Sequence, residues 1–559
     1  MAFSPTFFHN FSVTSPDVLA VIFAVSAYAV WRAYSFVSFV YRTPLRILPG
    51  PPVASLVYGN LKEIQEVEGS SLPDQWFTKY GKNFVDHEFF LTPRLWTLDT
   101  RAINHILTHS VDYARAEENL RQSVQFFGKG KRSFSLLVVQ GEQHRQQRRI
   151  LNPAFGPAQV RDLTEIFVQK ATQLRDVWAE AASKAGGLAR VNVNRDLSKA
   201  TLDIIGMAGF NYDFHTLDGG EKPNELYAAF RQLFANLRPV SLFGYLSAWF
   251  PFLKMLPNER LKALNGAAAS IRRIGGKIVA DQKASVLQAA AEKHHDIERK
   301  DLQKRDLLTL LIKANMATDI PGDQKMTDAD VMGQIPTFLL AGHETTSTAT
   351  TWALYAFCKY PKVQQKLREE LLSVDTDAPT MEELNALPYL DHVVHELLRV
   401  FPPVTLLVRE AKKDDVIPLD EPFIDKYGKV HHEIPIGKGN KVVIPILAAH
   451  RSKAIWGEDV LEFKPERWDQ PPESISAMPG VWGHLLTFIG GPRACIGYRF
   501  SLVETKALLF ALVRAFEFEF AVPVEDICTK TAPLQRPSLR SAPKEGFQLP
   551  LLVKPYKAA

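Results

Sequence analysis

The chain has 559 residues, of which 46% are hydrophobic and 23% are charged, the balance of an ordinary globular protein. Its 66 basic and 61 acidic residues leave a net charge of +5, which is small for this length and argues against nucleic acid as a partner. Only three cysteines are present, Cys358, Cys495 and Cys528, and none forms a CxxC pair. A disulfide scaffold and a structural zinc site are therefore disfavoured, and a reducing compartment is favoured.

The N-terminal region predicts a transmembrane anchor over residues 18–41. Residues 18–31 are apolar apart from Ser26, and Arg32 is the only charge in the span. Residues 1–17 contain no Lys or Arg, unlike the start of a cleavable signal peptide. Arginines follow the span, so the positive-inside rule places residues 1–17 in the lumen and the body in the cytosol. A buried or interfacial helix is the alternative, because Arg32 shortens the apolar run.

A basic, proline-rich hinge is predicted over residues 42–55, and a catalytic body over residues 56–559. Helical patterns dominate the body, and we find no internal repeat. Long, mostly apolar helices are predicted from the Thr327 N-cap to residue 360, from 388 to the prolines at 402 and 403, and over 498–516. Strand-like runs are short, at 441–447 and 516–522. The predicted fold class is mainly α with small β-sheets (α+β).

Cys495 lies in the stretch FIGGPRACIG, residues 488–497. The glycines favour a close backbone approach, and backbone N–H groups with a helix just downstream should lower the pKa of the thiol. A lone thiolate suits a haem axial ligand, and Arg493 is placed to pair with a haem propionate. On these residues alone, Cys495 could also be a small buried hydrophobe or a nucleophile.

The pattern Phe488-x-x-Gly491-x-Arg493-x-Cys495-x-Gly497 resembles the haem-binding loop of the cytochrome P450 family. The resemblance extends from the proline-rich hinge to the C-terminal strands, and is greatest to fungal microsomal members. It implies a triangular helical domain that holds haem b between a long central helix and the cysteine loop. It also implies that Cys495 is the axial ligand of the haem iron.

Ala341–Thr346, in the middle of the long helix, reads AGHETT. Glycine and hydroxyl residues are poor helix formers, and hydroxyls can bond back to the i−4 carbonyl and bend a helix. A helix-packing seam is one explanation. The resemblance instead assigns Glu344 and Thr345 as the catalytic acid–alcohol pair that relays protons during oxygen activation.

Glu396 and Arg399 lie three residues apart on one predicted helix face, where such pairs usually decorate a solvated surface. They resemble the E-x-x-R element of the family, which pairs with the arginine of a downstream loop, here Arg467. The family more often has Phe where this loop has Trp468. The resemblance makes Glu396, Arg399 and Arg467 structural rather than catalytic.

Three further residues are implied to bind the haem propionates. The stretch from Gly141 to Arg149 resembles the family's W-x-x-x-R helix, with His144 in place of the tryptophan and Arg148 as the arginine. Arg409 matches another propionate-binding arginine. The neighbouring Arg145 and Arg149 could form a docking patch for an acidic reductase or an ordinary solvated face.

The resemblance implies a monooxygenase of the endoplasmic reticulum membrane that hydroxylates or epoxidises a lipophilic small molecule, a terpenoid, steroid, fatty acid or aromatic. Fungal secondary metabolism or detoxification is the implied setting. Electrons would come from NADPH through NADPH–cytochrome P450 reductase, with cytochrome b5 as a further partner. Residues 115–134 would form a lid over the pocket, and the apolar stretch 241–256 either a second membrane contact or core packing. A P450-type isomerase or dehydratase without external electrons, or a non-catalytic haem-binding protein, is the alternative.

Overall fold

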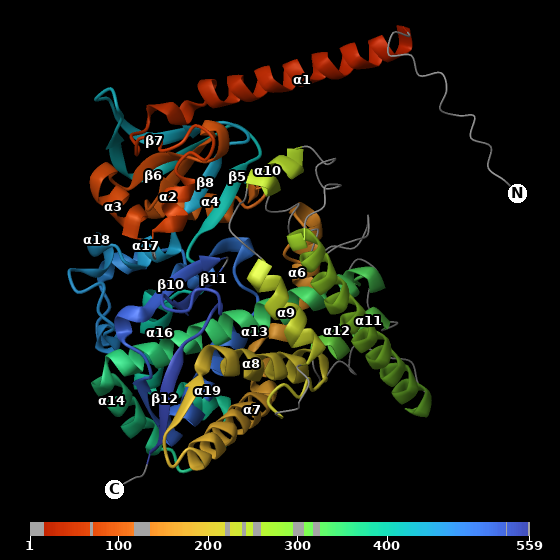
Figure 1. The fold of residues 1–559 in the computed structure, drawn as a ribbon, viewed down its shortest axis with the longest axis vertical. Helices are drawn as coiled ribbons and strands as arrows, with labels where there is room; N and C mark the ends of the chain where they lie inside the picture. Colours follow the sequence, from red (N-terminus) through yellow and green to blue (C-terminus); the bar gives the residue numbers. More distant parts are fainter. Residues whose placement is uncertain are drawn as a thin grey trace, which may run out of the picture.

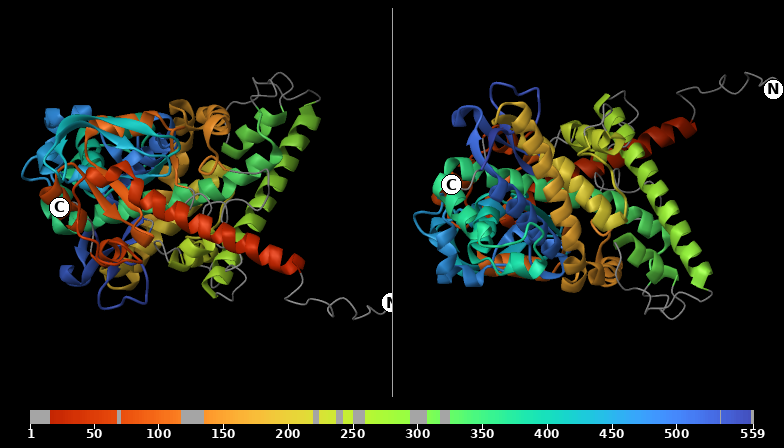
Figure 2. Two further views of the ribbon diagram at one scale, coloured as in Figure 1. Left: turned by 90° about the horizontal axis from the view of Figure 1, so that it is seen from above. Right: turned by 90° about the horizontal axis from the view of Figure 1, so that it is seen from below.

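The chain folds into a helical part and a smaller strand-rich part, and helix α1 (Pro16–Arg42) extends away from the strand-rich part (Figure 1). The computed structural model describes residues 16–67, 71–116, 135–218, 224–236, 242–249, 259–293, 307–316, 325–532 and 534–556. In both views of Figure 2, α1 runs outward beyond the body. The mainly α architecture with small sheets confirms the predicted fold class.

Helices make up most of the described chain. The longer ones after α1 are α3 (Ser71–Tyr80), α6 (Gly141–Leu151), α7 (Pro157–Lys184), α8 (Val193–Phe210), α9 (Glu225–Asn236), α11 (Glu259–Lys293), α12 (Leu307–Met316), α13 (Asp328–Lys359), α14 (Pro361–Leu372), α16 (Pro388–Val400) and α19 (Tyr498–Ala515). The shorter ones are α2 (Leu61–Glu66), α4 (Thr100–Thr108), α10 (Leu242–Trp249), α15 (Met381–Asn385), α17 (Ile446–His450) and α18 (Lys453–Trp456).

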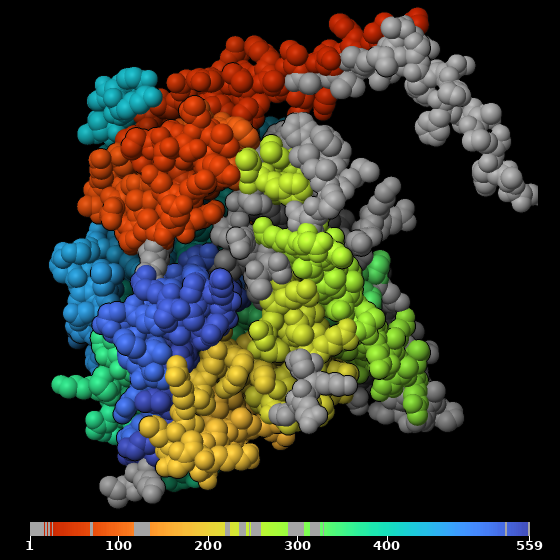
Figure 3. All heavy atoms as spheres, viewed as in Figure 1, coloured from red at the N-terminus to blue at the C-terminus, as the bar shows by residue number. Residues whose placement is uncertain are grey.

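Four small sheets accompany the helices. The largest has the strand order β1-β2-β8-β5-β3, with β1 (Asn83–His87), β2 (Pro93–Thr97), β8 (Lys441–Ile444), β5 (Leu407–Ala411) and β3 (Tyr113–Arg115). The others are β6 (Asp415–Ile424) with β7 (Val430–Ile436), β10 (Ile527–Ala532) with β11 (Leu534–Leu539), and β12 (Pro550–Pro555) between β4 (Ala189–Asn192) and β9 (Phe516–Phe520). The C-terminal strands, blue in Figure 3, lie between the N-terminal strand region and helices α7 and α8.

Helix α13 is the central helix and packs closely against α8. It begins as predicted, because the Thr327 hydroxyl accepts a hydrogen bond from the Asp330 N–H at 3.1 Å. A Cβ atom on Gly342 would lie 2.7 Å from the Ile205 side chain, so glycine is what allows the two helices to approach here. Thr201 of α8 donates a hydrogen bond to the His343 carbonyl at 2.9 Å. The AGHETT stretch is thus also a packing seam.

The other predicted elements are present with small differences. Helix α16 ends at Val400, before the two prolines, and α19 covers Tyr498–Ala515. The prediction of a strand over 441–447 was wrong at its C-terminal end, because β8 stops at Ile444. Pro445 has no N–H to continue the ladder, and α17 begins directly after it. Strand β9 likewise ends at Phe520 rather than at residue 522.

The N-terminal segments differ in how far the structure supports them. Within the described part of the chain, no helix combines the length and the apolar character that crossing a membrane requires. The anchor over 18–41 therefore stays a prediction, and residues 1–15 lie outside the described residues. The proline-rich hinge packs on the body, since the Val85 N–H donates to the Pro49 carbonyl at 2.9 Å.

Two predicted segments over the substrate pocket are described only in part. Residues 117–134 of the predicted lid lie outside the described residues. Of the apolar stretch 241–256, the structure describes α10. Leu242, at the start of α10, packs against the small cluster of Leu61 and Phe89, which favours core packing at that end.

Candidate functional site

The cysteine loop joins two short 3-10 turns, Leu486–Phe488 and Gly491–Arg493, to the start of α19. The Cys495 N–H donates to the Phe488 carbonyl at 2.8 Å, which closes the loop on itself. Cys495 is exposed to solvent, yet protein atoms surround the sulfur closely enough that burial raises the pKa of its thiol. The Gly497 N–H and the Arg148 guanidinium oppose this rise only in part. The prediction of a lowered thiol pKa was therefore wrong for the protein alone, because desolvation outweighs the backbone donors.

Two glycines of the loop differ in what a side chain at their position would contact. Gly491 has a φ of +69°, and a Cβ atom there would lie 2.5 Å from the Leu107 carbonyl oxygen, so the protein itself excludes a side chain. A Cβ atom on Gly497 would meet only the Phe155 ring at an ordinary 3.7 Å. The fold therefore tolerates a side chain at Gly497. Because Gly497 has no side chain, a flat group could approach closely beside Cys495.

Four arginines from four segments gather beside the loop. Arg115 of β3 and Arg409 of β5 are directly paired across the sheet, and Arg148 comes from α6. The Arg148 guanidinium donates to the Ala494 carbonyl, and Arg493 Nη2 donates to the Val139 carbonyl at 2.8 Å. Arg115 Nη1 donates to the Leu137 carbonyl at 2.7 Å. Arg409 Nη1 donates to the Val408 carbonyl at 3.1 Å, so each of the four side chains bonds to a backbone carbonyl.

This arginine cluster (Arg115, Arg148, Arg409 and Arg493) is electrostatically unbalanced. Burial, together with Arg115 and Arg493, lowers the pKa of Arg409 to about 9. Burial, together with Arg115 and Arg148, lowers the pKa of Arg493 to about 10. No carboxylate among the described residues forms an ion pair with any of the four. Burying like charges without a counter-ion costs free energy, so we expect the cluster to bind an anionic group.

His144 lies on α6 one turn before Arg148 and is buried. Burial, together with Arg493 and Arg148, lowers its pKa to about 4, so its imidazole is neutral at physiological pH. A neutral imidazole can still donate one hydrogen bond to an anion. Arg145 and Arg149, on the same helix, are exposed, and Arg145 pairs with Glu142 at 3.1 Å.

Glu344 and Thr345 are adjacent on α13 but differ in their surroundings. Glu344 is buried, forms an ion pair with Arg536 of β11, and lies 3.1 Å from His343 Nε2. Burial alone would raise the pKa of Glu344, but Arg536 and His343 together hold it below its usual range. Thr345 is half-buried, and its hydroxyl donates to the Ala341 carbonyl at 2.7 Å.

Glu396, Arg399 and Arg467 form a fully interior cluster rather than a solvated face. Arg399 Nε and Nη2 donate to the two carboxylate oxygens of Glu396 at 2.8 and 2.7 Å, and both side chains are completely buried. Arg467 Nε lies 3.5 Å from Glu396 Oε1. Trp468 Nε1 donates to Glu396 Oε2 at 3.1 Å, so the tryptophan adds a hydrogen bond that phenylalanine cannot make.

Sequence reasoning missed three residues of this region: Arg115, Arg536 and Glu504. Arg115 and Arg536 meet their partners only through the pairing of β3 with β5 and the packing of β11 on α13. Glu504 lies on α19, is fully buried, and has no hydrogen-bond partner among the described residues for either carboxyl oxygen. Glu504 is the one acidic residue of helix α19, and its apolar neighbours Leu502, Val503, Ala507 and Leu508 were the available signal for its burial.

The residues present fit the haem that the cysteine loop implies. An accessible thiol, an adjacent position without a side chain, and an unpaired arginine cluster match an iron ligand, a flat macrocycle and two propionates. Metal coordination deprotonates a thiol, which compensates for the raised pKa of Cys495. No acidic side chain in the described part of the chain balances this positive charge, and the haem carboxylates would balance it.

Comparisons with known proteins agree with this fit. The family model described as cytochrome P450 matches residues 49–542. The chain is 52% identical over 547 residues to cytochrome P450 monooxygenase 205 of Postia placenta (strain ATCC 44394 / Madison 698-R), covering 98% of this chain and 99% of the relative. It is 50% identical to cytochrome P450 monooxygenase 128 of the same fungus, with the same coverage. It is 35% identical to cytochrome P450 monooxygenase claQ of Ampulloclitocybe clavipes, covering 92% and 93%. The chain therefore belongs to the cytochrome P450 family and is a haem-thiolate monooxygenase.

Proposed function

We propose that this monooxygenase hydroxylates or epoxidises a lipophilic small molecule in fungal secondary metabolism or detoxification, using O2 and electrons from NADPH. The observation that carries the proposal is the unpaired arginine cluster beside the accessible Cys495 thiol. The bound haem supplies the oxidising chemistry through its iron. Fungal relatives of the same length support the biological setting.

The roles of the chain's own residues follow from their positions. Cys495 would hold the haem iron through its thiolate. Arg148, Arg409 and Arg493 would hold the propionates with charge-assisted hydrogen bonds. His144 contributes a neutral donor in place of the family's tryptophan.

Glu344 and Thr345 move protons into the site. The Glu344 carboxylate is held by Arg536 and His343, so it releases or accepts a proton only when one of these contacts loosens. The Thr345 hydroxyl can leave the Ala341 carbonyl and point a donor into the helix groove. Such a gated pair would limit proton delivery to the closed, substrate-bound enzyme.

Electrons reach the site from NADPH–cytochrome P450 reductase, with cytochrome b5 as a second donor. The exposed Arg145 and Arg149 of α6 supply a basic contact for an acidic partner. Residues 18–41 anchor the chain in the endoplasmic reticulum membrane with its body in the cytosol. The large apolar side chains exposed on α1, Phe23, Tyr28, Val30 and Trp31, support that placement.

The test is oxygen isotope transfer in membranes that contain the chain and its reductase. A lipophilic compound that shifts the haem spectrum would be incubated with NADPH and isotopically labelled O2. The proposal expects a product carrying a single labelled oxygen atom, formed only when NADPH and the reductase are present. Turnover without NADPH would indicate an isomerase or dehydratase, and no turnover of any spectrally bound compound would contradict the proposal.

A further inference from the structure

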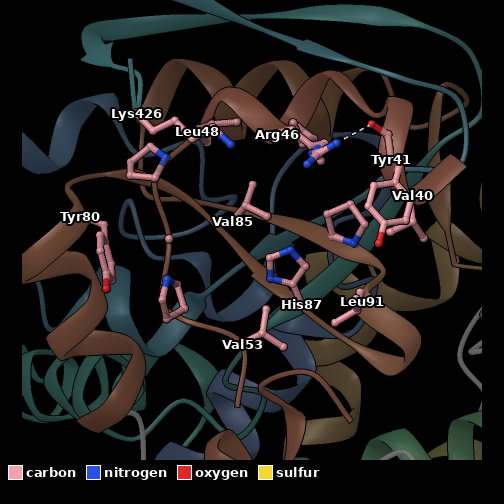
Figure 4. Close-up of a pocket in the computed structure, with 15 residues that line it drawn as sticks. Val40, Tyr41, Arg46, Leu48, Val53, Tyr80, Val85, His87, Leu91 and Lys426 are labelled. Atoms are coloured by element: carbon pink, nitrogen blue, oxygen red, sulfur yellow. Dashed lines mark hydrogen bonds between the residues drawn. The ribbon is translucent and has the colours of Figure 1, made fainter. Parts of the chain in front are cut away.

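A cavity of about 510 Å³ lies between the end of α1, the proline-rich hinge and the first two strands, away from the cysteine loop. This volume is within the range of small-molecule sites. Its walls are mainly apolar, and the apolar lining side chains that are not fully buried include Val40, Val53 and Leu91. Figure 4 shows Val85 and His87 in the middle of the cavity, with Val53 on the side opposite Arg46 and Lys426. The cavity thus has an apolar interior and a basic side.

The charged groups of this cavity all have the same sign. Arg46 and Lys426 are among the described residues that line it, and no Asp or Glu is. Arg46 Nη1 donates to the Tyr41 carbonyl at 2.9 Å, which fixes the guanidinium at the mouth and leaves its other N–H groups available. The Lys426 N–H donates to the Ile47 carbonyl at 3.0 Å, so the β6–β7 turn is held against the hinge. The Arg46 side chain and the Lys426 backbone are therefore both held beside one mainly apolar cavity.

His87 adds an unpaired polar atom to the wall. Its Nδ1 is buried and has no hydrogen-bond partner in the described part of the chain. Burial lowers the pKa of His87, and the nearby Arg94 lowers it further, whereas Asp86 raises it. The net shift is downward, so the ring is neutral. A buried polar atom normally has a partner, and an unpaired one indicates a missing neighbour.

We propose that this cavity binds an anionic amphiphile, with its apolar chain against Val40, Val53 and Leu91 and its acidic head at Arg46 and Lys426. A carboxylate or a phosphate head has the same chemistry here, since both accept charge-assisted hydrogen bonds from Arg and Lys. His87 lines the same cavity. The site is separate from the haem-binding residues, and binding there requires no turnover.

The test counts bound amphiphiles on the full-length holoenzyme by native mass spectrometry from a non-ionic detergent. Two anionic probes are used, oleate and dioleoyl phosphatidate, with oleyl alcohol and dioleoyl phosphatidylcholine as matched probes without net charge. The test variant is Arg46→Gln with Lys426→Gln. The control is Arg42→Gln with Lys429→Gln, which removes the same charge from exposed positions outside the cavity.

The proposal expects the wild-type protein and the control to hold an anionic probe at least about tenfold more tightly than its uncharged match, since one charge-assisted hydrogen bond is worth this much. The test variant should lose that preference. The two anionic probes show which head group is preferred. Equal retention by the test variant and the control, or equal binding of charged and uncharged probes to the wild type, would overturn the proposal.

A second measurement locates the probe. A photoreactive fatty acid should label peptides from residues 40–53 and 85–93, and labelling only elsewhere would also overturn the proposal. The haem absorbance band is recorded for every variant to show that the fold is intact. It should not change on probe binding, so the result is independent of the proposed monooxygenase reaction.

Discussion

Two buried glutamates on neighbouring helices have pKa values shifted in opposite directions by their surroundings. Glu344 of α13 is neutralised by Arg536 and approached by His343, and its pKa is held below the usual range. Burial raises the pKa of Glu504 of α19 well above the usual range. Thr346 lies close enough to lower that pKa slightly, but its hydroxyl pairs with Ser501 Oγ at 3.1 Å and no hydrogen bond reaches the carboxyl. Glu344 is therefore ionised in the fold, and Glu504 is protonated.

We expect Glu504→Gln to stabilise the protein increasingly as the pH rises. The unfolded chain releases the Glu504 proton above about pH 4.3, whereas the folded protein keeps it, so the wild type loses stability with rising pH until its raised pKa is reached. The neutral amide removes this loss, which amounts to about 1.4 kcal/mol per pH unit. Urea unfolding between pH 4 and pH 8 measures the difference. Glu519→Gln, at an exposed position, is the control, and parallel pH profiles for the wild type and Glu504→Gln would refute a protonated Glu504.

Arg536→Gln should destabilise the protein at neutral pH, because it leaves the Glu344 carboxylate buried without its counter-charge. Breaking a buried ion pair costs about 3–5 kcal/mol. The lowered pKa of Glu344 means that the pair stabilises the fold above the unfolded pKa of about 4.3, and that this contribution is lost as the pH falls through the folded pKa. The difference in unfolding free energy between wild type and variant should therefore shrink in acid. Lys530→Gln, on the strand position opposite Arg536, removes an exposed charge and should have little effect at any pH.

At the scale of elements, local sequence signals predicted where helices end. They did not predict contacts between side chains that lie far apart in the sequence. The Thr327 cap and the prolines after α16 act on their own neighbours, and the structure has those ends. The pairing of Arg115 with Arg409 depends on sheet register, and the contact of Arg536 with Glu344 depends on how a hairpin packs on α13. The net pKa of Cys495 also depended on desolvation, which no motif encodes.

Helix α16 contributes the most completely buried ion pair among the described residues, and Arg399→Ala should expose how much the fold depends on it. Arg399 also donates to the carbonyls of His450 at 2.9 Å and Val460 at 2.8 Å, so the substitution removes a bridge between α16 and the following loops. We expect a loss of about 3–5 kcal/mol in unfolding free energy, since the buried Glu396 carboxylate loses both hydrogen bonds from Arg399 and keeps only Arg467, 3.5 Å away, as a counter-charge.

The matched control for Arg399→Ala is Arg161→Ala. Arg161 pairs with Glu382 on the surface, where both side chains are more than half exposed, so its removal should cost much less. Urea unfolding followed by circular dichroism compares the two variants. Similar losses would show that burial of the Glu396–Arg399 pair does not contribute as inferred.

At the scale of the whole molecule, segments far apart in the sequence meet at one site. The cysteine loop, β3, β5 and α6 together bring an accessible thiol and the arginine cluster to one place. The motifs predicted the family, the fold class and most members of this site. The charge balance of the site became visible only in three dimensions.

The most direct test of the central claim, that Cys495 is the thiolate ligand of a haem, is the reduced, carbon monoxide-bound difference spectrum of the membrane-expressed protein. It is recorded for the wild type, for Cys495→Ser and for the control Cys358→Ser, which alters a partly buried cysteine on α13. We predict a red-shifted Soret band of the thiolate type in the wild type and in Cys358→Ser, and its loss in Cys495→Ser. A folded wild-type protein without that band, or a Cys495→Ser variant that retains it, would contradict the account.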